Sequence, residues 1–216
     1  MRLLNLYDNY KANDDFEIGW GFSCLIESDG KKILFDVGEE DKKIFSNMER
    51  AGVKASDIDI LVISHTDWDH IGGLSSLRKL NPSIEVYMPD AFSEPRKIAE
   101  GIYTTGLMKA EPDEQSLVLK SEKGLVIITG CAHPGIVQII KKVKLFFKEQ
   151  IYLVLGGFHL MDNPEEEVSG IINEFKELGV NKVAPSHCTG KKAIDMFKRK
   201  YKDNFIENFA GNIIKI

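Results

Sequence analysis

Apolar and polar residues in the first third of the chain alternate in a way that predicts strands with two intervening helices. Apolar runs bounded by turn residues predict strands at 2–8, 21–28, 31–38, 57–64 and 83–88. Asp29-Gly30 joins the second and third of these runs, and this dipeptide is a strong hairpin signal. Charged segments with a spaced apolar face predict helices at 41–51 and 72–80.

The second half of the chain alternates between strand and helix patterns. Strands are predicted at 116–120, 124–130, 151–157 and 181–185, helices at 134–150, 164–179 and 190–201, and two short closing strands at 204–210 and 212–216. The stretch 89–115 has three of the seven prolines and little periodicity, so it predicts a long loop with one helical turn. This order predicts an α/β fold of two sheets covered by helices, in a single domain over residues 1–216.

Composition excludes several classes of function. The hydrophobic fraction of 43% and the charged fraction of 28% are those of an ordinary globular protein. A net charge of −5 argues against a nucleic-acid-binding protein, whose surface is usually basic. No apolar run is long enough for a signal peptide or a membrane helix, so membrane contact is not expected. Cys24, Cys131 and Cys188 are widely spaced, which predicts free thiols in a reducing cytoplasm.

The histidines follow one rule of placement. Four of the five come at or just beyond the end of a predicted strand, and the fifth, His70, closes the cluster that begins at His65; the other three are His133, His159 and His187. The carboxyl ends of strands in α/β sheets are where ligands usually bind. The pattern therefore predicts one shared site in place of five separate loop histidines.

The segment "HTDWDHIGG" concentrates the candidate ligands. In an extended chain His65, Asp67 and Asp69 point the same way, and His70 can turn toward a second position at the start of the next helix. The two glycines that follow let the helix backbone pack closely. Imidazole and carboxylate groups are ligands for zinc, iron and manganese, so we expect one or two divalent transition metals here.

This segment is similar to the HxHxDHxGG signature of the metallo-β-lactamase superfamily. The resemblance continues through "YDN", "GFSCLI", "LFDVG", "ITGCAHPGI", "LGGFHL" and "PSHCTG", and is strongest to the branch with dihydropteroate-synthase-like enzymes of the methanopterin pathway. The resemblance implies a four-layer αββα sandwich. It also implies a metal site in which one ion is held by His65, Asp67 and His133, and a second by Asp69, His70 and His187.

Two positions depart from the signature. Asp67 stands where histidine is usual, and a carboxylate there favours harder ions such as manganese or iron, unless it only hydrogen-bonds a ligand histidine. Cys131 stands where the superfamily usually has a bridging aspartate. It is interpreted either as a thiolate ligand or, more commonly for such a residue, as a small buried side chain.

Further residues are expected around the metals. His159 is a candidate substrate contact, general acid or ligand, and Asp162 is predicted to cap the helix that follows it. Two predicted helices begin directly after His133 and His187, and helix N-termini attract anions. Thr189 and Lys191 are therefore expected to bind an anionic substrate, while Cys188 is interpreted as structural.

These features predict a metal-dependent hydrolase. Metal-activated water would attack an ester, amide or phosphoester of a small anionic substrate, with Asp69 or Asp67 steering the proton of the nucleophile. An iron-dependent oxidoreductase of the same fold and a non-catalytic metal- or ligand-binding protein are the alternatives.

Overall fold

Each of two parts of the chain builds one six-stranded sheet. The computed structural model describes residues 1–216, which divide into unit 1 (1–91 with 208–216) and unit 2 (92–207). Unit 1 contains the sheet β12-β1-β2-β3-β4-β5, and unit 2 contains the sheet β11-β10-β9-β8-β7-β6. The expected single domain over 1–216 stays a prediction, and the two units are described separately.

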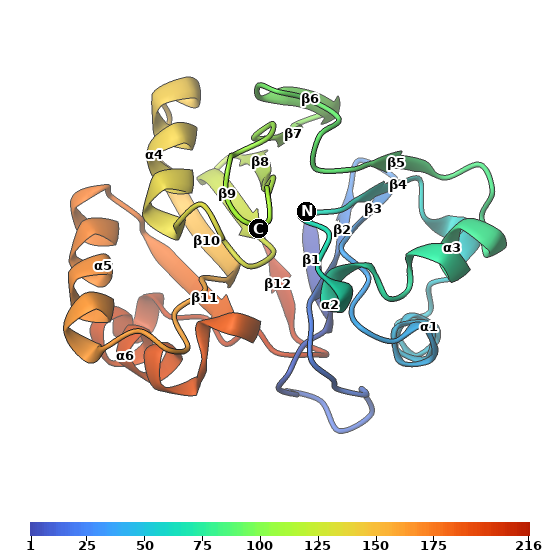
Figure 1. The fold of residues 1–216 in the computed structure, drawn as a ribbon, viewed down its shortest axis with the longest axis horizontal. Helices are drawn as coiled ribbons and strands as arrows, with labels where there is room; N and C mark the ends of the chain where they lie inside the picture. The colour runs from blue at the N-terminus through green and yellow to red at the C-terminus, as the bar shows by residue number, and fades with distance from the viewer. The chain divides into compact units, whose positions relative to one another are not determined.

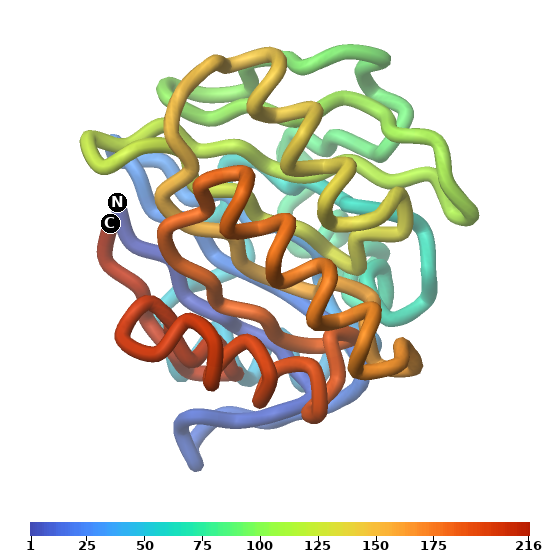
Figure 2. Tube along the Cα trace, turned by 90° about the vertical axis from the view of Figure 1, so that its left-hand side faces the viewer, coloured from blue at the N-terminus to red at the C-terminus, as the bar shows by residue number.

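Unit 1 begins and ends with neighbouring strands. Its elements are β1 (Arg2–Tyr7), β2 (Ser23–Ser28), β3 (Lys31–Phe35), α1 (Asp41–Arg50), β4 (Ile60–Val62), α2 (Trp68–Ile71), α3 (Leu74–Leu80), β5 (Glu85–Tyr87) and β12 (Ile213–Lys215). β12 pairs antiparallel with β1, so the two chain ends lie side by side in Figure 2. The hairpin predicted at Asp29-Gly30 is confirmed, with both residues in the left-handed conformation that such turns require.

Helices α1 and α3 bury one face of the first sheet. Ile44 and Met48 of α1 and Leu77 of α3 pack in one cluster with Leu34 of β3 and Leu61 of β4. Each fully buried side chain of this size contributes about 1.5–3 kcal/mol relative to an exposed one. β3 and β4 run parallel, so the loops that follow them leave the sheet at the same edge.

Unit 2 has the α/β alternation expected from the sequence. Its elements are β6 (Arg96–Ala99), β7 (Ile102–Thr104), β8 (Leu117–Ser121), β9 (Gly124–Thr129), α4 (Ile136–Phe147), β10 (Ile151–Gly157), α5 (Glu165–Glu177), β11 (Lys182–Ser186) and α6 (Lys191–Tyr201). In Figure 1, α4, α5 and α6 line one face of this sheet. The parallel neighbours β9, β10 and β11 end at a common edge.

An aromatic cluster anchors that edge. The rings of Phe158, Phe175 and Phe197 lie with centroids 5.3 to 5.5 Å apart, joining the end of β10 to α5 and α6. All three side chains are buried. Because Phe158 directly precedes His159, this packing fixes where the chain turns toward the candidate site.

Three local predictions were wrong. The stretch 89–115 contains the antiparallel strands β6 and β7 joined at Gly101, where a predominantly exposed edge strand gives little apolar pattern. Residues 204–210 form no strand, because Phe205 and Ala210 make only isolated bridges, to Val183 and to Lys11. Asp162 does not cap α5: the cap position is Pro164, which makes no side-chain hydrogen bond there.

Candidate metal centre

In unit 1, the four predicted ligands of "HTDWDH" lie beyond the end of β4. His65 and His70 are fully buried and their ring centroids are 4.1 Å apart. Nε2 of His65 lies 3.5 Å from Oδ2 of Asp67, and Nε2 of His70 lies 3.7 Å from Oδ2 of Asp69. In each imidazole, Nε2 therefore faces a carboxylate, and Nδ1 on the other side of the ring is left for a supporting hydrogen bond.

Asp36, at the end of β3, supports both imidazoles. Its fully buried carboxylate accepts hydrogen bonds from the Ser64 backbone N–H at 2.7 Å and from the Ser64 hydroxyl at 2.6 Å, and it pairs with Nδ1 of His70 at 2.7 Å. Since the Ser64 hydroxyl donates to Asp36, its oxygen is left to accept from Nδ1 of His65, which is 2.8 Å away. This network assigns the proton to Nδ1 on both rings.

The tautomers decide whether the donor set fits a metal. With Nδ1 protonated on His65 and His70, each Nε2 carries its lone pair toward a carboxylate oxygen that also bears lone pairs. Two such donors facing each other fit a cation between them. Metal-bound histidines commonly donate their other ring N–H to a carboxylate or hydroxyl in this way. The residues present therefore fit a divalent metal.

The segment that carries these ligands packs closely against the loop after β3, because glycine at position 72 has no side chain. A Cβ at Gly72 would lie 2.0 Å from the carbonyl oxygen of Glu39, and the Gly72 N–H donates to the Gly38 carbonyl at 2.8 Å. The loop after β3 and the start of the helical segment thus touch backbone to backbone, as the glycine pair predicted. Asp69 lies inside α2, so the expected extended geometry over residues 65–69 ends at Asp67.

In unit 2, the remaining histidines follow the three parallel strands. His133 follows β9, His159 follows β10 and His187 follows β11. The rings of His133 and His159 have centroids 4.5 Å apart, and Nε2 of His187 is 3.3 Å from Sγ of Cys131. Ligand atoms of Cys131, His133 and His159 lie within 4.8 Å of one another, as do those of Cys131, His187 and Cys188. Within this unit the histidines therefore lie in two close groups that share Cys131, and one site common to all five histidines stays a prediction.

Glu114 fixes the loop that carries His133. Its buried carboxylate accepts three backbone N–H bonds, from Cys131 at 3.1 Å, Ala132 at 2.9 Å and His133 at 2.8 Å. Nothing in the sequence marked this residue, because it lies in an irregular segment and acts on a loop that comes 17 residues later or more. The carboxylate holds the loop in one conformation.

The side chains of His159 and Cys188 influence each other. The hydrogen bond with Cys188, donated by the protonated ring, raises the pKa of His159 against the effect of burial, and the charges on Cys188, Glu114 and Asp162 add to that shift. Burial raises the pKa of the Cys188 thiol, but its contacts with Cys131, His187 and His159 outweigh burial and hold the pKa well below its usual range. Cys188 thus lies in the cluster with Cys131 and His187, although it was interpreted from the sequence as a structural residue.

The proposed substrate contacts have different surroundings. Thr189 is fully buried and its hydroxyl accepts the Phe158 N–H at 3.0 Å. Lys191 is exposed and pairs with Asp195 at 3.0 Å. Both residues flank the start of α6, and their role in substrate binding stays a prediction.

Left-handed backbone conformations mark both clusters. Four non-glycine residues at or beside the candidate ligands have positive φ: Asp36 (60°), Ala132 (64°), His159 (54°) and His187 (49°). Such conformations are uncommon outside glycine and cost about 1–3 kcal/mol each where the surroundings impose them. Their occurrence at the candidate ligands is typical of functional sites.

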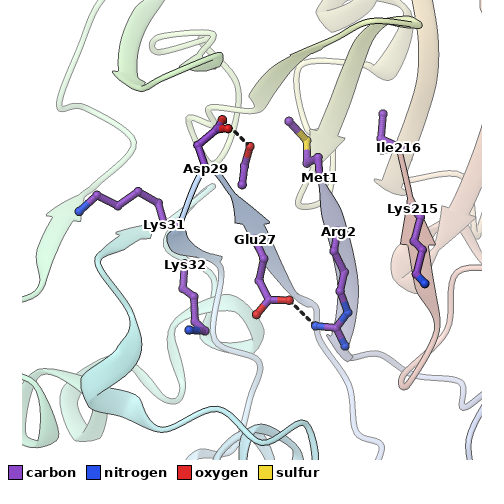
Figure 3. Close-up of a pocket in the computed structure, with 10 residues that line it drawn as sticks. Met1, Arg2, Glu27, Asp29, Lys31, Lys32, Lys215 and Ile216 are labelled. Atoms are coloured by element: carbon purple, nitrogen blue, oxygen red, sulfur yellow. Dashed lines mark hydrogen bonds and ion pairs between the residues drawn. The ribbon is translucent and has the colours of Figure 1, made fainter.

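A separate pocket of about 500 Å³ lies away from these residues. It is formed in unit 1 where β1 and β3 begin and where β2 and β12 end. Asp36 and Ser64 lie at the other end of these strands. Figure 3 shows its basic side chains, among which Arg2 pairs with Glu27. None of the candidate metal ligands lines this pocket.

Comparison with known proteins decides the family. The family model described as the metallo-beta-lactamase superfamily matches residues 21–141. The chain belongs to this superfamily. A curated relative from Methanocaldococcus jannaschii, named 7,8-dihydropterin-6-methyl-4-(beta-D-ribofuranosyl)-aminobenzene-5'-phosphate synthase, is 31% identical and the match covers 100% of this chain and 96% of the relative.

Solved structures of the superfamily agree along the whole chain. Tm1679, described as a metal-dependent hydrolase of the beta-lactamase superfamily, is 28% identical with a TM-score of 0.85, over 100% of this chain and 99% of that one. YhfI from Bacillus subtilis, a metallo-beta-lactamase fold protein, is 14% identical with a TM-score of 0.68, over 99% and 98% of the two chains. The metallo-β-lactamase fold and the resemblance to the methanopterin branch are therefore confirmed. No helix of the structure has both the length and the apolar character needed to cross a membrane.

Proposed function

We propose that this chain is a metal-dependent hydrolase of a small anionic substrate, acting on an ester, amide or phosphoester. The observation that carries the proposal is the network from Asp36, which leaves Nε2 of both His65 and His70 facing a carboxylate. Membership of a superfamily with a hydrolase 28% identical over the full chain supports the same reaction class.

The ligands are proposed from the resemblance and from the donor chemistry of each unit. His65, Asp67 and His133 would hold one divalent ion, and Asp69, His70 and His187 would hold a second. Within each unit these residues follow strand ends. Buried hydrogen bonds hold the imidazoles of His65 and His70 and the backbone of His133 before a metal binds.

The chemistry divides between the metal and the chain. A bound zinc, manganese or iron ion lowers the pKa of water and polarises the bond to be broken. Asp69 or Asp67 would accept the proton of the attacking water. His159, which is exposed at the end of β10 and has a raised pKa, would donate a proton to the leaving group.

The N-termini of two helices would attract the negative charge of the substrate. Helices α4 and α6 begin at Ile136 and Lys191, directly after the loops of His133 and His187, and neither has a side-chain cap. Their first amides offer hydrogen bonds and a partial positive charge to an anion. Thr189 and Lys191 would complete an anion-binding surface for a phosphate or carboxylate.

A second candidate is a synthase reaction. It is favoured by the 31% identity, over the whole chain, to a relative whose name gives its product as an aminobenzene ribofuranosyl 5'-phosphate joined to a dihydropterin. This candidate shares the anionic substrate with the first and differs in the bond made or broken.

A substrate panel separates the candidates. The full-length chain, loaded separately with zinc, manganese or iron under anaerobic conditions, is assayed on esters, amides, phosphodiesters and the substrates of the synthase reaction. We expect hydrolysis that is lost in His70→Ala and kept in Asp59→Asn. Asp59 directly precedes β4 and pairs with Lys31 at the start of β3, whereas Asp36 follows the end of β3. Turnover of the synthase substrates alone supports the second candidate. Electron transfer without hydrolysis supports the iron oxidoreductase, and metal binding without any turnover supports a binding protein.

A further inference from the structure

Two of the three cysteines lie next to candidate ligands in unit 2. Cys131 and Cys188 follow β9 and β11, strands that both neighbour β10 in the sheet, and both side chains are buried. Sγ of Cys131 is 3.3 Å from Nε2 of His187, and Sγ of Cys188 is 3.6 Å from the carbonyl oxygen of Cys131. The sulfur atoms therefore face the same small volume as the imidazole.

The spacing of these donors matches one tetrahedral ion. Ligand atoms of Cys131, His187 and Cys188 all lie within 4.8 Å of one another. Zinc–sulfur and zinc–nitrogen bonds of about 2.3 and 2.0–2.1 Å at tetrahedral angles place a sulfur and a nitrogen donor about 3.6 Å apart. The Cys131–His187 separation of 3.3 Å is within a few tenths of an ångström of that value.

The backbone makes room for the sulfur atoms. A Cβ at Gly157, the last residue of β10, would lie 2.6 Å from Sγ of Cys188, so glycine is needed for the sulfur to sit against the strand. Ala132 and His187, each next to one of the cysteines, have left-handed conformations. Conformational strain on both sides of a buried thiol pair is more than hydrophobic packing requires.

The third cysteine shows the contrasting arrangement. Cys24 lies inside β2, and Sγ is 3.9 Å from the carbonyl oxygen of Leu25. It belongs to none of the groups of histidine, cysteine and carboxylate donors that lie close enough to share an ion. Cys24 is a small apolar core residue, and it serves as the matched control for the other two.

We propose that Cys131, Cys188 and His187 bind one zinc-class ion through two thiolates and an imidazole. The fourth donor is supplied by His133 or His159, whose ligand atoms form a second close group with Cys131. The proposal rests on the proposed function in one respect, that His187 is a metal ligand, and it reassigns this imidazole from the ion of Asp69 and His70 to the thiolate-bound ion. It adds a thiolate-rich set, which selects zinc, iron or copper(I) over manganese, and it requires both thiols to release their protons when the ion binds.

Spectroscopy of the full-length chain tests the proposal under reducing conditions. Cobalt(II) bound by thiolates gives an intense near-ultraviolet charge-transfer band, whereas a site of imidazole and carboxylate gives only weak visible bands. We expect the band in the wild-type protein and in Cys24→Ser, a loss of at least half its intensity in Cys131→Ser and in Cys188→Ser, and no change in His65→Ala. Thermal unfolding of each variant confirms that it is folded.

X-ray absorption of the zinc-loaded wild-type protein gives the same answer without any variant. We expect sulfur scatterers at about 2.3 Å from zinc, in addition to nitrogen or oxygen at about 2.0 Å. Cobalt binding without the charge-transfer band, and zinc without sulfur, would overturn the thiolate site and leave the proposed hydrolase standing. A charge-transfer band in a protein without hydrolytic activity would support the thiolate site and contradict the proposed function.

Discussion

Oδ2 of Asp36 lies 2.7 Å from Nδ1 of His70, and both side chains are fully buried. Asp36 directly follows β3 and His70 lies in the helical turn that follows β4, so the contact joins the loops beyond the ends of two parallel strands. A carboxylate that accepts a hydrogen bond from Nδ1 fixes the tautomer of the imidazole. Both candidate imidazole ligands of unit 1 therefore depend on Asp36, His70 directly and His65 through Ser64.

Asp36→Asn should weaken metal binding without unfolding the chain. Asparagine tolerates the left-handed conformation at this position, but its amide would donate to Nδ1 and move the proton of His70 to Nε2. We expect metal affinity to fall by about 10–100-fold. Competition with a chelator measures the affinity, and nitrogen NMR of the histidine rings reports the tautomer. Asp59→Asn is the control, and equal affinities in the two variants would refute the role of Asp36.

Glu114→Gln tests the support of the His133 loop. The glutamine amide would face at least one of the three backbone N–H groups that the carboxylate now accepts, leaving a buried donor without an acceptor. We expect a loss of about 1–3 kcal/mol in the free energy of unfolding, measured in urea. Hydrogen exchange at residues 131–133 should accelerate.

The neighbouring acid gives a matched control for that change. Asp113 pairs with Lys109 at the surface and lies one residue from Glu114. Asp113→Asn should change the free energy of unfolding by no more than about 0.5 kcal/mol. If both variants lost the same stability, Glu114 would have no special role.

Alanine at two glycines should have opposite effects. Gly72→Ala places Cβ 2.0 Å from the Glu39 carbonyl oxygen, and we expect a cost of about 1–3 kcal/mol from the backbone shift. Gly170 lies in α5 with open space around it, so Gly170→Ala should stabilise the fold by about 0.5–1 kcal/mol through helix propensity. Urea unfolding measures both. A neutral Gly72→Ala would contradict the close packing of the ligand segment.

Asp67→His should move metal preference toward zinc. The Asp67 side chain is 43% exposed and its carboxylate reaches Nε2 of His65, so the position can accept either ligand type. Replacing oxygen by nitrogen favours zinc over harder ions, and we expect the ratio of zinc to manganese affinity to rise. Competitive titrations of both ions on the two proteins measure this ratio. A parallel loss for both metals would show that Asp67 acts only as a hydrogen-bond acceptor for a ligand.

The part of the candidate site that lies directly after strands could be predicted from the sequence. The histidines follow apolar runs whose ends are visible in the pattern, and parallel neighbours such as β9, β10 and β11 bring those ends together. The hairpin at Asp29-Gly30 is a local feature of the same kind. So are the helices that begin at Ile136 and Lys191, which were predicted from 134 and 190.

Long-range contacts account for what the sequence did not reveal. Glu114 acts through hydrogen bonds to backbone atoms far along the chain, and no local pattern encodes them. Cys188 was interpreted as structural because its partner, Cys131, is separated from it by 57 residues. The pairing of β6 with β7 went unnoticed because exposed edge strands do not need an apolar face.

Metal occupancy in ligand variants tests the central claim most directly. The wild-type chain, the control Asp59→Asn, and the four variants His65→Ala, Asp69→Ala, His70→Ala and His187→Ala are equilibrated with a limiting concentration of zinc, and bound metal is counted by elemental analysis. The account predicts reduced occupancy in each of the four ligand variants and wild-type occupancy in the control. Wild-type occupancy in all four ligand variants would contradict it.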